Sequence, residues 1–175
     1  MTDSSLHDTQ IVDLEAQPTV AVRIQQPMAE MDLSAAFDRY MPLVMTRVEA
    51  EGGAIAGPPF GRYHRFGPDQ VDVEIGFPVS AIPAGLPPLE ACAPGDVGVS
   101  ELPGGLVART VHRGSYDGLS KTYDVLHTWI HEQPGYDDGA GPWESYVDDP
   151  GAVADQGEVR TEVNWPLVVL AQAPR

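Results

Sequence analysis

An internal repeat constrains the fold of this chain more than any other feature. Segments 71–79 and 159–167 share one pattern: Val, a spacer, a β-branched residue, Glu, an aliphatic residue, a spacer, an aromatic residue and Pro. Glu74 and Glu162 hold the same place in it, 88 positions apart in a chain of 175 residues. A repeat at half the chain length indicates a duplicated supersecondary unit whose copies bury a face together. A carboxylate is therefore expected at equivalent places in both halves.

Weaker matches extend the repeat over most of the chain. Leu33-Ser34 matches Leu119-Ser120, Phe37-Asp38 matches Tyr123-Asp124, Arg23 matches Arg109, and Gly57-Pro58 matches Gly141-Pro142. The shift changes by a residue or two between segments, because insertions in surface loops cost little. The expected organisation is a disordered tail (1–9) and one domain (10–175), with repeat one at about 10–79, a Pro/Gly-rich linker at 80–95 and repeat two at about 96–172.

Local patterns predict a β-α-β-β order in each repeat. Asp32 and Ser115 are expected to cap the two helices, and Pro42 is expected to kink or split the first one. The first repeat should contain a strand over 11–26 with a turn near Gln17-Pro18, a helix to about Glu51, and strands over 61–66 and 71–79. The second should contain a strand over 97–112 broken at 103–105, a helix ending at 133–135, and strands over 143–147 and 159–170. The fold class expected is α+β, with a largely antiparallel sheet and one buried stripe per helix.

Charge and cysteine content narrow the classes of partner. A net charge of −16 argues against a nucleic-acid surface, which needs clustered Lys and Arg, and against anionic membranes, while it suits cationic partners. Cys92 is the single cysteine and has no basic neighbour to activate it, so we expect neither a disulfide framework nor a reactive thiol. Neither a signal peptide nor a membrane-spanning apolar run is evident, so the expected location is cytoplasmic.

No motif in the sequence predicts a metal or a cofactor. His127 and His131 are four residues apart on a helix, a spacing that can bind zinc, but no third ligand is indicated and a solvated pair is expected. The acidic loop residues around Asp137 and Asp148 lack the spacing of a calcium-binding loop. A nucleophile elbow and a phosphate-binding or dinucleotide-binding glycine loop are also absent from the sequence.

Alternation along the last strand of each repeat places the two glutamates on the face opposite the aliphatic residues. Glu162 shares its face with Arg160 and Asn164, and Glu74 shares its face with Asp72 and Gly76. Such a face is either solvated or lines a cleft. Arg160 is close enough in sequence to pair with Glu162 and neutralise it.

The second half resembles the GyrI-like, or bacterial effector-binding, small-molecule-binding domain. The residues that carry the resemblance are Gly114, Tyr116, Leu119, Tyr123, Leu126, Trp129, Ile130, Tyr146, Asp149-Pro150, Thr161-Glu162-Val163 and Pro166, with Gly57-Pro58-Pro59, Tyr63, Val73-Glu74 and Pro78 in the first half. The resemblance covers about residues 10–172. It implies two β-α-β-β repeats related by a pseudo-twofold axis, helices on one face of the sheet, and a ligand cleft between the halves. A buried glutamate of the last strand, here Glu162, would face the ligand.

Three functions remain open at this point. In the first, the chain binds hydrophobic, aromatic, cationic molecules through Glu162, Glu74 and an aromatic set of Tyr63, Tyr116, Trp143, Tyr146 and Trp165. In the second, which the resemblance implies for some standalone members, Glu162 is the general base of a hydrolase that opens cyclopropane rings of DNA-alkylating natural products, with Tyr146, or else Tyr63 or Tyr116, as hydrogen-bond donor. In the third, the acidic surface binds a protein partner such as gyrase.

Overall fold

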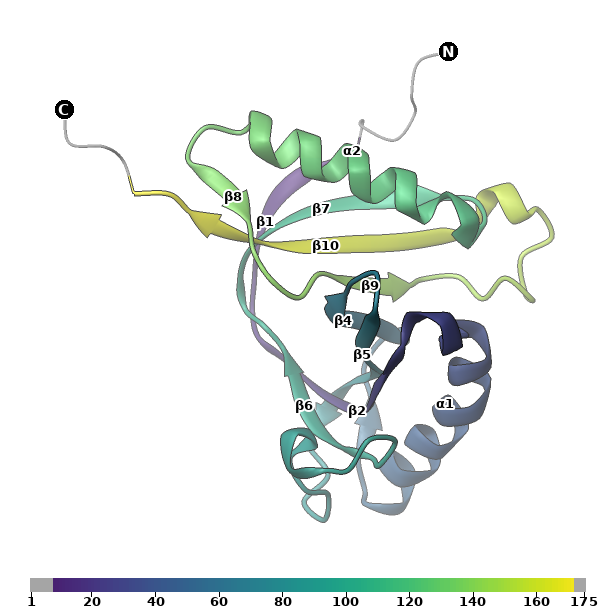
Figure 1. Ribbon diagram of the computed structural model, residues 1–175. Coiled ribbons are helices and arrows are strands. Elements are labelled where there is room, and N and C mark those ends of the chain that lie inside the picture. Colours follow the sequence, from purple (N-terminus) through teal and green to yellow (C-terminus); the bar gives the residue numbers. More distant parts are fainter. Residues whose placement is uncertain (1–7, 172–175) are drawn as a thin grey trace. The chain divides into compact units, whose positions relative to one another are not determined.

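The computed structural model describes residues 8–171, which form two compact units (Figure 1). Of the described residues, unit 1 contains 8–14 and 105–171, and unit 2 contains 15–104. Within the described residues every pairing between named strands is antiparallel, and each unit has one long α-helix. The predicted α+β class and β-α-β-β order are therefore confirmed.

Unit 2 is a four-stranded sheet covered by one helix. Its strands run in the order β4-β5-β2-β6, and the short strand β3 also pairs with β5. The elements are β2 (Gln17–Pro27), α1 (Leu33–Ala50), β3 (Ala54–Ile55), β4 (Phe60–Phe66), β5 (Gln70–Ala81) and β6 (Gly98–Leu102). One face of β5, with Val71, Val73 and Ile75, packs with Val44 and Val48 of α1 in the core. This is the face that alternation predicted to be apolar.

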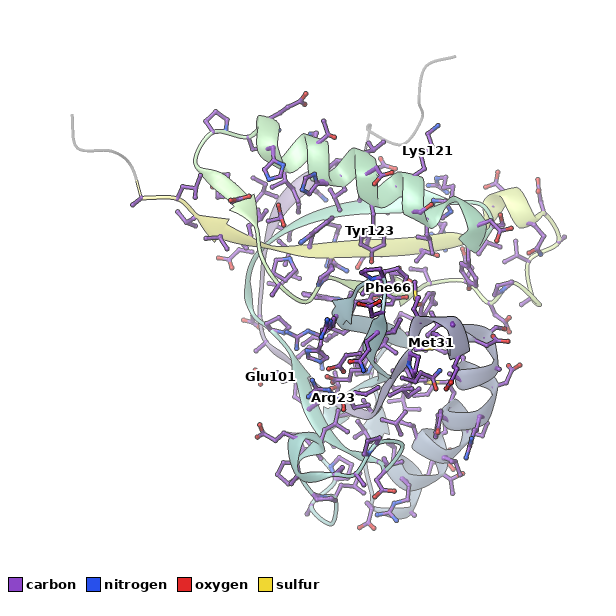
Figure 2. All side chains as sticks on the ribbon, in the orientation of Figure 1. Arg23, Met31, Phe66, Glu101, Lys121 and Tyr123 are labelled. Atoms are coloured by element: carbon purple, nitrogen blue, oxygen red, sulfur yellow. The ribbon has the colours of Figure 1, made fainter. Side chains whose placement is uncertain are left out.

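Unit 1 repeats the arrangement. Its strands run in the order β1-β7-β10-β9, and the short strand β8 also pairs with β10. The elements are β1 (Gln10–Leu14), β7 (Gly105–Arg113), α2 (Leu119–Glu132), β8 (Tyr136–Asp138), β9 (Trp143–Tyr146) and β10 (Arg160–Val169). Ala108 and Val163 pack with Leu126 and Ile130 of α2. Figure 2 shows Tyr123 on the side of α2 that faces these strands, whereas Lys121 points away from them.

The units exchange their first strands. β1 precedes β2 in the chain but pairs with β7, and β6 precedes β7 but pairs with β2. The strand predicted over 11–26 is thus two strands of different units, and the break lies at Glu15-Ala16 rather than near Gln17-Pro18. The compact units consequently differ from the sequence repeats at their boundaries.

Of the local predictions about the helices, the Asp32 cap is confirmed and the Ser115 cap is corrected. Asp32 caps α1, because its Oδ1 accepts a hydrogen bond of 3.0 Å from the backbone N–H of Ala35. α1 runs from Leu33 to Ala50 with Pro42 inside it, so Pro42 does not split the helix, and the kink stays a prediction. Ser115 makes no side-chain cap; it precedes a 3₁₀ turn (Tyr116–Gly118) that leads into α2.

The predicted tail lies mostly outside the described residues. Residues 1–7 are not described. Thr9, the last residue of that segment, donates a 3.0 Å hydrogen bond from its Oγ1 to the Oγ1 of Thr110 on β7. The C-terminal end of the predicted tail is therefore tied to unit 1.

Candidate functional site

Strand β9 of unit 1 carries a buried carboxylate next to a tyrosine. In the register with β10, Glu144 lies opposite Val163 and Tyr146 lies opposite Thr161. Because opposite residues of antiparallel strands project to the same side, Glu144 and Tyr146 share the face on which Val163 packs against α2. Glu144 is only 3% exposed. Burying a carboxylate is costly unless its oxygens are hydrogen-bonded, so the partners of Glu144 matter for its placement.

Two tyrosines surround this carboxylate. The hydroxyl of Tyr146 donates a 2.6 Å hydrogen bond to Oε2 of Glu144. The ring of Tyr116, from the 3₁₀ turn before α2, meets the ring of Tyr146 edge to face, with centroids 5.6 Å apart and planes at 69°. Tyr116 is 43% exposed, whereas Glu144 is buried. Tyr116 and Tyr146 are thus in ring contact, and Tyr146 is hydrogen-bonded to Glu144; we call these three side chains the Glu144 site.

The electrostatics of the Glu144 site favour positive charge. Burial raises the pKa of the Tyr116 phenol, and the nearby carboxylates of Asp149, Glu144 and Asp148 raise it further. Each of these carboxylates disfavours the negatively charged phenolate form of Tyr116. A cation placed against this ring would be attracted by the same carboxylates and by the ring face.

The two repeats agree at the tyrosine of this site and differ at the carboxylate. Tyr63 of β4 lies opposite Val73, and Tyr146 of β9 lies opposite Thr161, the position that matches Val73 in the repeat. Two residues earlier, unit 2 has Gly61 where unit 1 has Glu144. The duplication therefore supplies two equivalent tyrosines but only one buried carboxylate beside them.

Glu162 lies on the other face of β10, away from the Glu144 site. It is opposite Ser145 of β9, and its side chain is 27% exposed rather than buried. Its Oε1 is 3.3 Å from Nη2 of Arg109 and also accepts a 3.3 Å hydrogen bond from the Asn164 amide. The pairing expected with Arg160 does not form, because Arg160 binds Asp148 at 2.8 Å through its Nε.

Glu74 of unit 2 is more deeply buried than Glu162. It is 2% exposed, and its Oε2 lies 2.9 Å from Nε2 of His64. Its Oε1 has no hydrogen-bond partner within the part of the chain that the structure describes. In unit 2, Glu74 lies opposite Arg23. In unit 1, Arg109, the counterpart of Arg23, lies opposite Asn164 and not opposite Glu162. The two glutamates of the repeat therefore pair in different registers with the neighbouring strand. They are equivalent in sequence and not in pairing.

The other predicted aromatic residues have separate environments. Trp165 donates a 2.9 Å hydrogen bond from Nε1 to the carbonyl of Gly139 and packs edge to face against Tyr123. Trp143 is buried on the Glu162 face of β9. Tyr63 packs edge to face with Phe66 in unit 2.

Of the predicted site residues, the structure brings together Tyr116 and Tyr146. The carboxylate that joins them, Glu144, was missed. A signal for it existed: Glu144 and Tyr146 are two residues apart in a short strand, a spacing that places both side chains on one face. The repeat drew attention to Glu74 and Glu162, and Glu144 has no counterpart in the first half.

A groove lies elsewhere, in unit 2, beside α1. Its lining includes Leu43, Arg47, Cys92, Asp96 and Val97. Burial, followed by the charge of Asp96, raises the pKa of the Cys92 thiol above its usual value. None of the predicted site residues lines this groove.

Comparison with known proteins establishes the family. The profile of the family described as GyrI-like small molecule binding domain matches residues 7–168. The chain belongs to this family. Small-molecule binding is accordingly its general function, and the resemblance noted in the sequence is confirmed. Among curated proteins none matches the chain significantly.

Solved structures share the fold at low sequence identity. The EcmrR C-terminal domain is 22% identical, with a TM-score of 0.74 over 94% of this chain and 99% of that one. The chain covers 57% of the EcmrR chain in its complex with DNA. SAV2435 bound to tetraphenylphosphonium is 13% identical, with a TM-score of 0.64 over 92% and 94% of the two chains. A hydrolase encoded by lin2189 from Listeria innocua is 11% identical, with a TM-score of 0.62 over 94% of each chain.

Neither α1 nor α2, the two α-helices of the described residues, is long and apolar enough to cross a bilayer.

Proposed function

We propose that this chain binds hydrophobic, aromatic, cationic small molecules at the Glu144 site. The observation that carries the proposal is a carboxylate that is 3% exposed, bonded by the Tyr146 hydroxyl, behind the half-exposed ring of Tyr116. A delocalised cation suits such a site because it is weakly hydrated and gives up little on entering. Each tyrosine face adds about 0.5–2 kcal/mol of cation–π attraction.

The acidic character of the whole chain supports the same class of ligand. Asp148 and Asp149 lie close enough to raise the pKa of Tyr116, and the net charge of the chain is −16. Long-range attraction then raises the local concentration of a cation and speeds its encounter. The fold neighbour SAV2435 holds tetraphenylphosphonium, which makes this ion a sensible first probe.

Two ions of the same shape and opposite charge test the proposal. Titration calorimetry with tetraphenylphosphonium should show saturable binding, and tetraphenylborate should bind at least about tenfold more weakly, a difference of about 1.4 kcal/mol. Apolar contact is nearly equal for the two ions, so the difference reports charge. Equal affinities would show that the site selects shape alone, and tighter binding of the borate would reject a cationic ligand.

A hydrolase is the second candidate, because the hydrogen bond from Tyr146 to Glu144 places a carboxylate base beside a hydrogen-bond donor. Glu144 would take a proton from water, and the water oxygen would attack a cyclopropane carbon. The other ring carbon would leave with the electron pair and be protonated, so the product gains one water. Glu162, the base expected from the resemblance, is already paired with Arg109. Mass spectrometry of a cyclopropane-containing alkylating compound decides between the candidates: a hydrated product supports the hydrolase, and intact compound bound at one equivalent supports the binder.

A further inference from the structure

The C-terminal half of α2 and strand β8 bring two imidazoles and a carboxylate together. His127 and His131 lie one turn apart on α2, and their ring centroids are 4.2 Å apart. Asp138 of β8 places its Oδ1 2.9 Å from Nε2 of His131 and 3.4 Å from Nε2 of His127. One ligand atom from each of the three residues lies within 4.8 Å of the others. The third ligand that the sequence did not indicate is therefore present.

The spacing of these atoms matches the edge of a small coordination shell. Zn²⁺ binds imidazole nitrogen and carboxylate oxygen at about 2.0–2.2 Å, so two ligand atoms of a tetrahedral site lie about 3.3–3.6 Å apart. Of the two nitrogen-to-oxygen distances to Asp138, 3.4 Å lies within that range and 2.9 Å lies below it. A metal ion can enter with small rotations of the three side chains.

The backbone holds the ligands in place from both sides. Both histidines belong to one helix, and Asp138 pairs with Leu167 in the ladder between β8 and β10. The short connection between α2 and β8 contains a 3.4 Å hydrogen bond from the N–H of Tyr136 to the carbonyl of Gln133, and the carbonyl of Gly135 accepts a 2.9 Å hydrogen bond from the N–H of Leu170, which follows β10. The ring of His127 also packs against Trp165, with centroids 5.8 Å apart. Ligands fixed in this way lose little freedom when a metal binds.

A second carboxylate completes the surroundings. Oδ1 of Asp137 lies 2.8 Å from Nε2 of His131 and accepts a 2.9 Å hydrogen bond from the N–H of Asp138. Asp137 is thus placed either to supply a fourth oxygen or to accept a hydrogen bond from a metal-bound water. The two aspartates also compensate the charge of a divalent ion.

We propose that His127, His131 and Asp138, with Asp137 beside them, bind a late first-row divalent metal ion, with Zn²⁺ as the reference. Two imidazoles with carboxylate oxygen favour Zn²⁺ and its neighbours in the series over Mg²⁺ or Ca²⁺, which prefer oxygen ligands alone. The ion would join α2 to β8 and hold the end of the helix that covers the sheet of unit 1. This site is separate from the Glu144 site and does not depend on the small-molecule proposal.

Titration of the metal-free full-length chain with ZnCl₂, in a buffer that does not chelate zinc, tests the site. We expect one equivalent to bind tightly to the wild type and the His131→Ala variant to bind more than about tenfold more weakly, since even outer-shell changes cost that much. A hundredfold excess of free Zn²⁺ over the Kd should raise the Tm of the wild type by about 5 °C or more. Co²⁺ should give the visible absorption of a four-coordinate site in the wild type only.

Glu132→Gln is the matched control, because it removes a carboxylate next to His131 that lies outside the cluster. It should bind Zn²⁺ as the wild type does. Circular dichroism and the Tm without metal show whether each variant is folded, and Asp138→Asn, which leaves both histidines in place, provides a second removal. Equal binding by all four proteins, or failure of the folded wild type to bind one equivalent, would overturn the proposal.

Discussion

Replacing Glu144 with Gln should weaken the binding of tetraphenylphosphonium by about thirtyfold or more. The substitution keeps the volume of the side chain and an oxygen that can accept the hydrogen bond of Tyr146, so it removes little except the charge. Losing one partner of a buried charge pair costs about 2–5 kcal/mol, and about 2 kcal/mol corresponds to thirtyfold. Calorimetric titration of the wild type and the variant measures the loss directly.

The two glutamates of the repeat provide matched controls for this experiment. Glu162→Gln removes a charge that is 27% exposed and paired with Arg109, and Glu74→Gln removes one that lies beside His64. Both variants should bind tetraphenylphosphonium with an affinity within about threefold of the wild type, because a charge outside the binding site contributes little to the binding free energy. A large loss of affinity in Glu162→Gln, together with an unchanged affinity in Glu144→Gln, would mean that the ligand binds beside the last strand, as the sequence predicted.

Replacing Gly76 with Ala should lower the free energy of unfolding by about 3 kcal/mol. Gly76 lies in the middle of β5, opposite Ala21 of β2 and Phe60 of β4. A Cβ at this position would overlap the backbone carbonyl oxygen of Val20 and lie 2.6 Å from the Cβ of Ala21. Because the obstacle is backbone in a central strand, it cannot rotate away, and overpacking of this kind costs about 1–3 kcal/mol or more. Urea unfolding followed by circular dichroism gives the difference.

Gly67→Ala is the control for the glycine substitution. Its Cβ would meet nothing closer than Nε of Arg65, at 3.7 Å, and its backbone does not have the positive φ that strains other residues. We expect its midpoint of unfolding to equal or exceed that of the wild type. Equal stability of Gly76→Ala and Gly67→Ala would mean that β2 and β5 are less closely packed than the structure has them.

The elements were predictable because they depend on local periodicity. Asp32 caps α1 as expected, and the apolar face of β5 packs against α1 as alternation required. α1 continues through Pro42, since Ala36 before the proline and Val44 and Val48 beyond it are buried. The exception has a local physical cause. Ser115 is displaced from the cap by a 3₁₀ turn.

Features that depend on pairing between distant segments were not predictable. The exchange of β1 and β6 cannot be deduced from alternation, since each strand looks the same whichever neighbour it joins. The same holds for Asp138, which reaches His127 and His131 only through the turn between α2 and β8. The repeat correctly indicated a duplicated unit. It pointed to Glu74 and Glu162 and not to Glu144, because Glu144 has no counterpart in the first half, where Gly61 holds the equivalent place.

A crystal structure of the chain with tetraphenylphosphonium tests the central claim most directly. We predict the phosphonium beside the carboxylate of Glu144, with phenyl rings against Tyr116 and Tyr146. The hydroxyl of Tyr146 should keep its hydrogen bond to Glu144. A phosphonium bound beside Glu162 and Arg109, or beside Glu74 and His64, with the Glu144 site unchanged, would contradict the account.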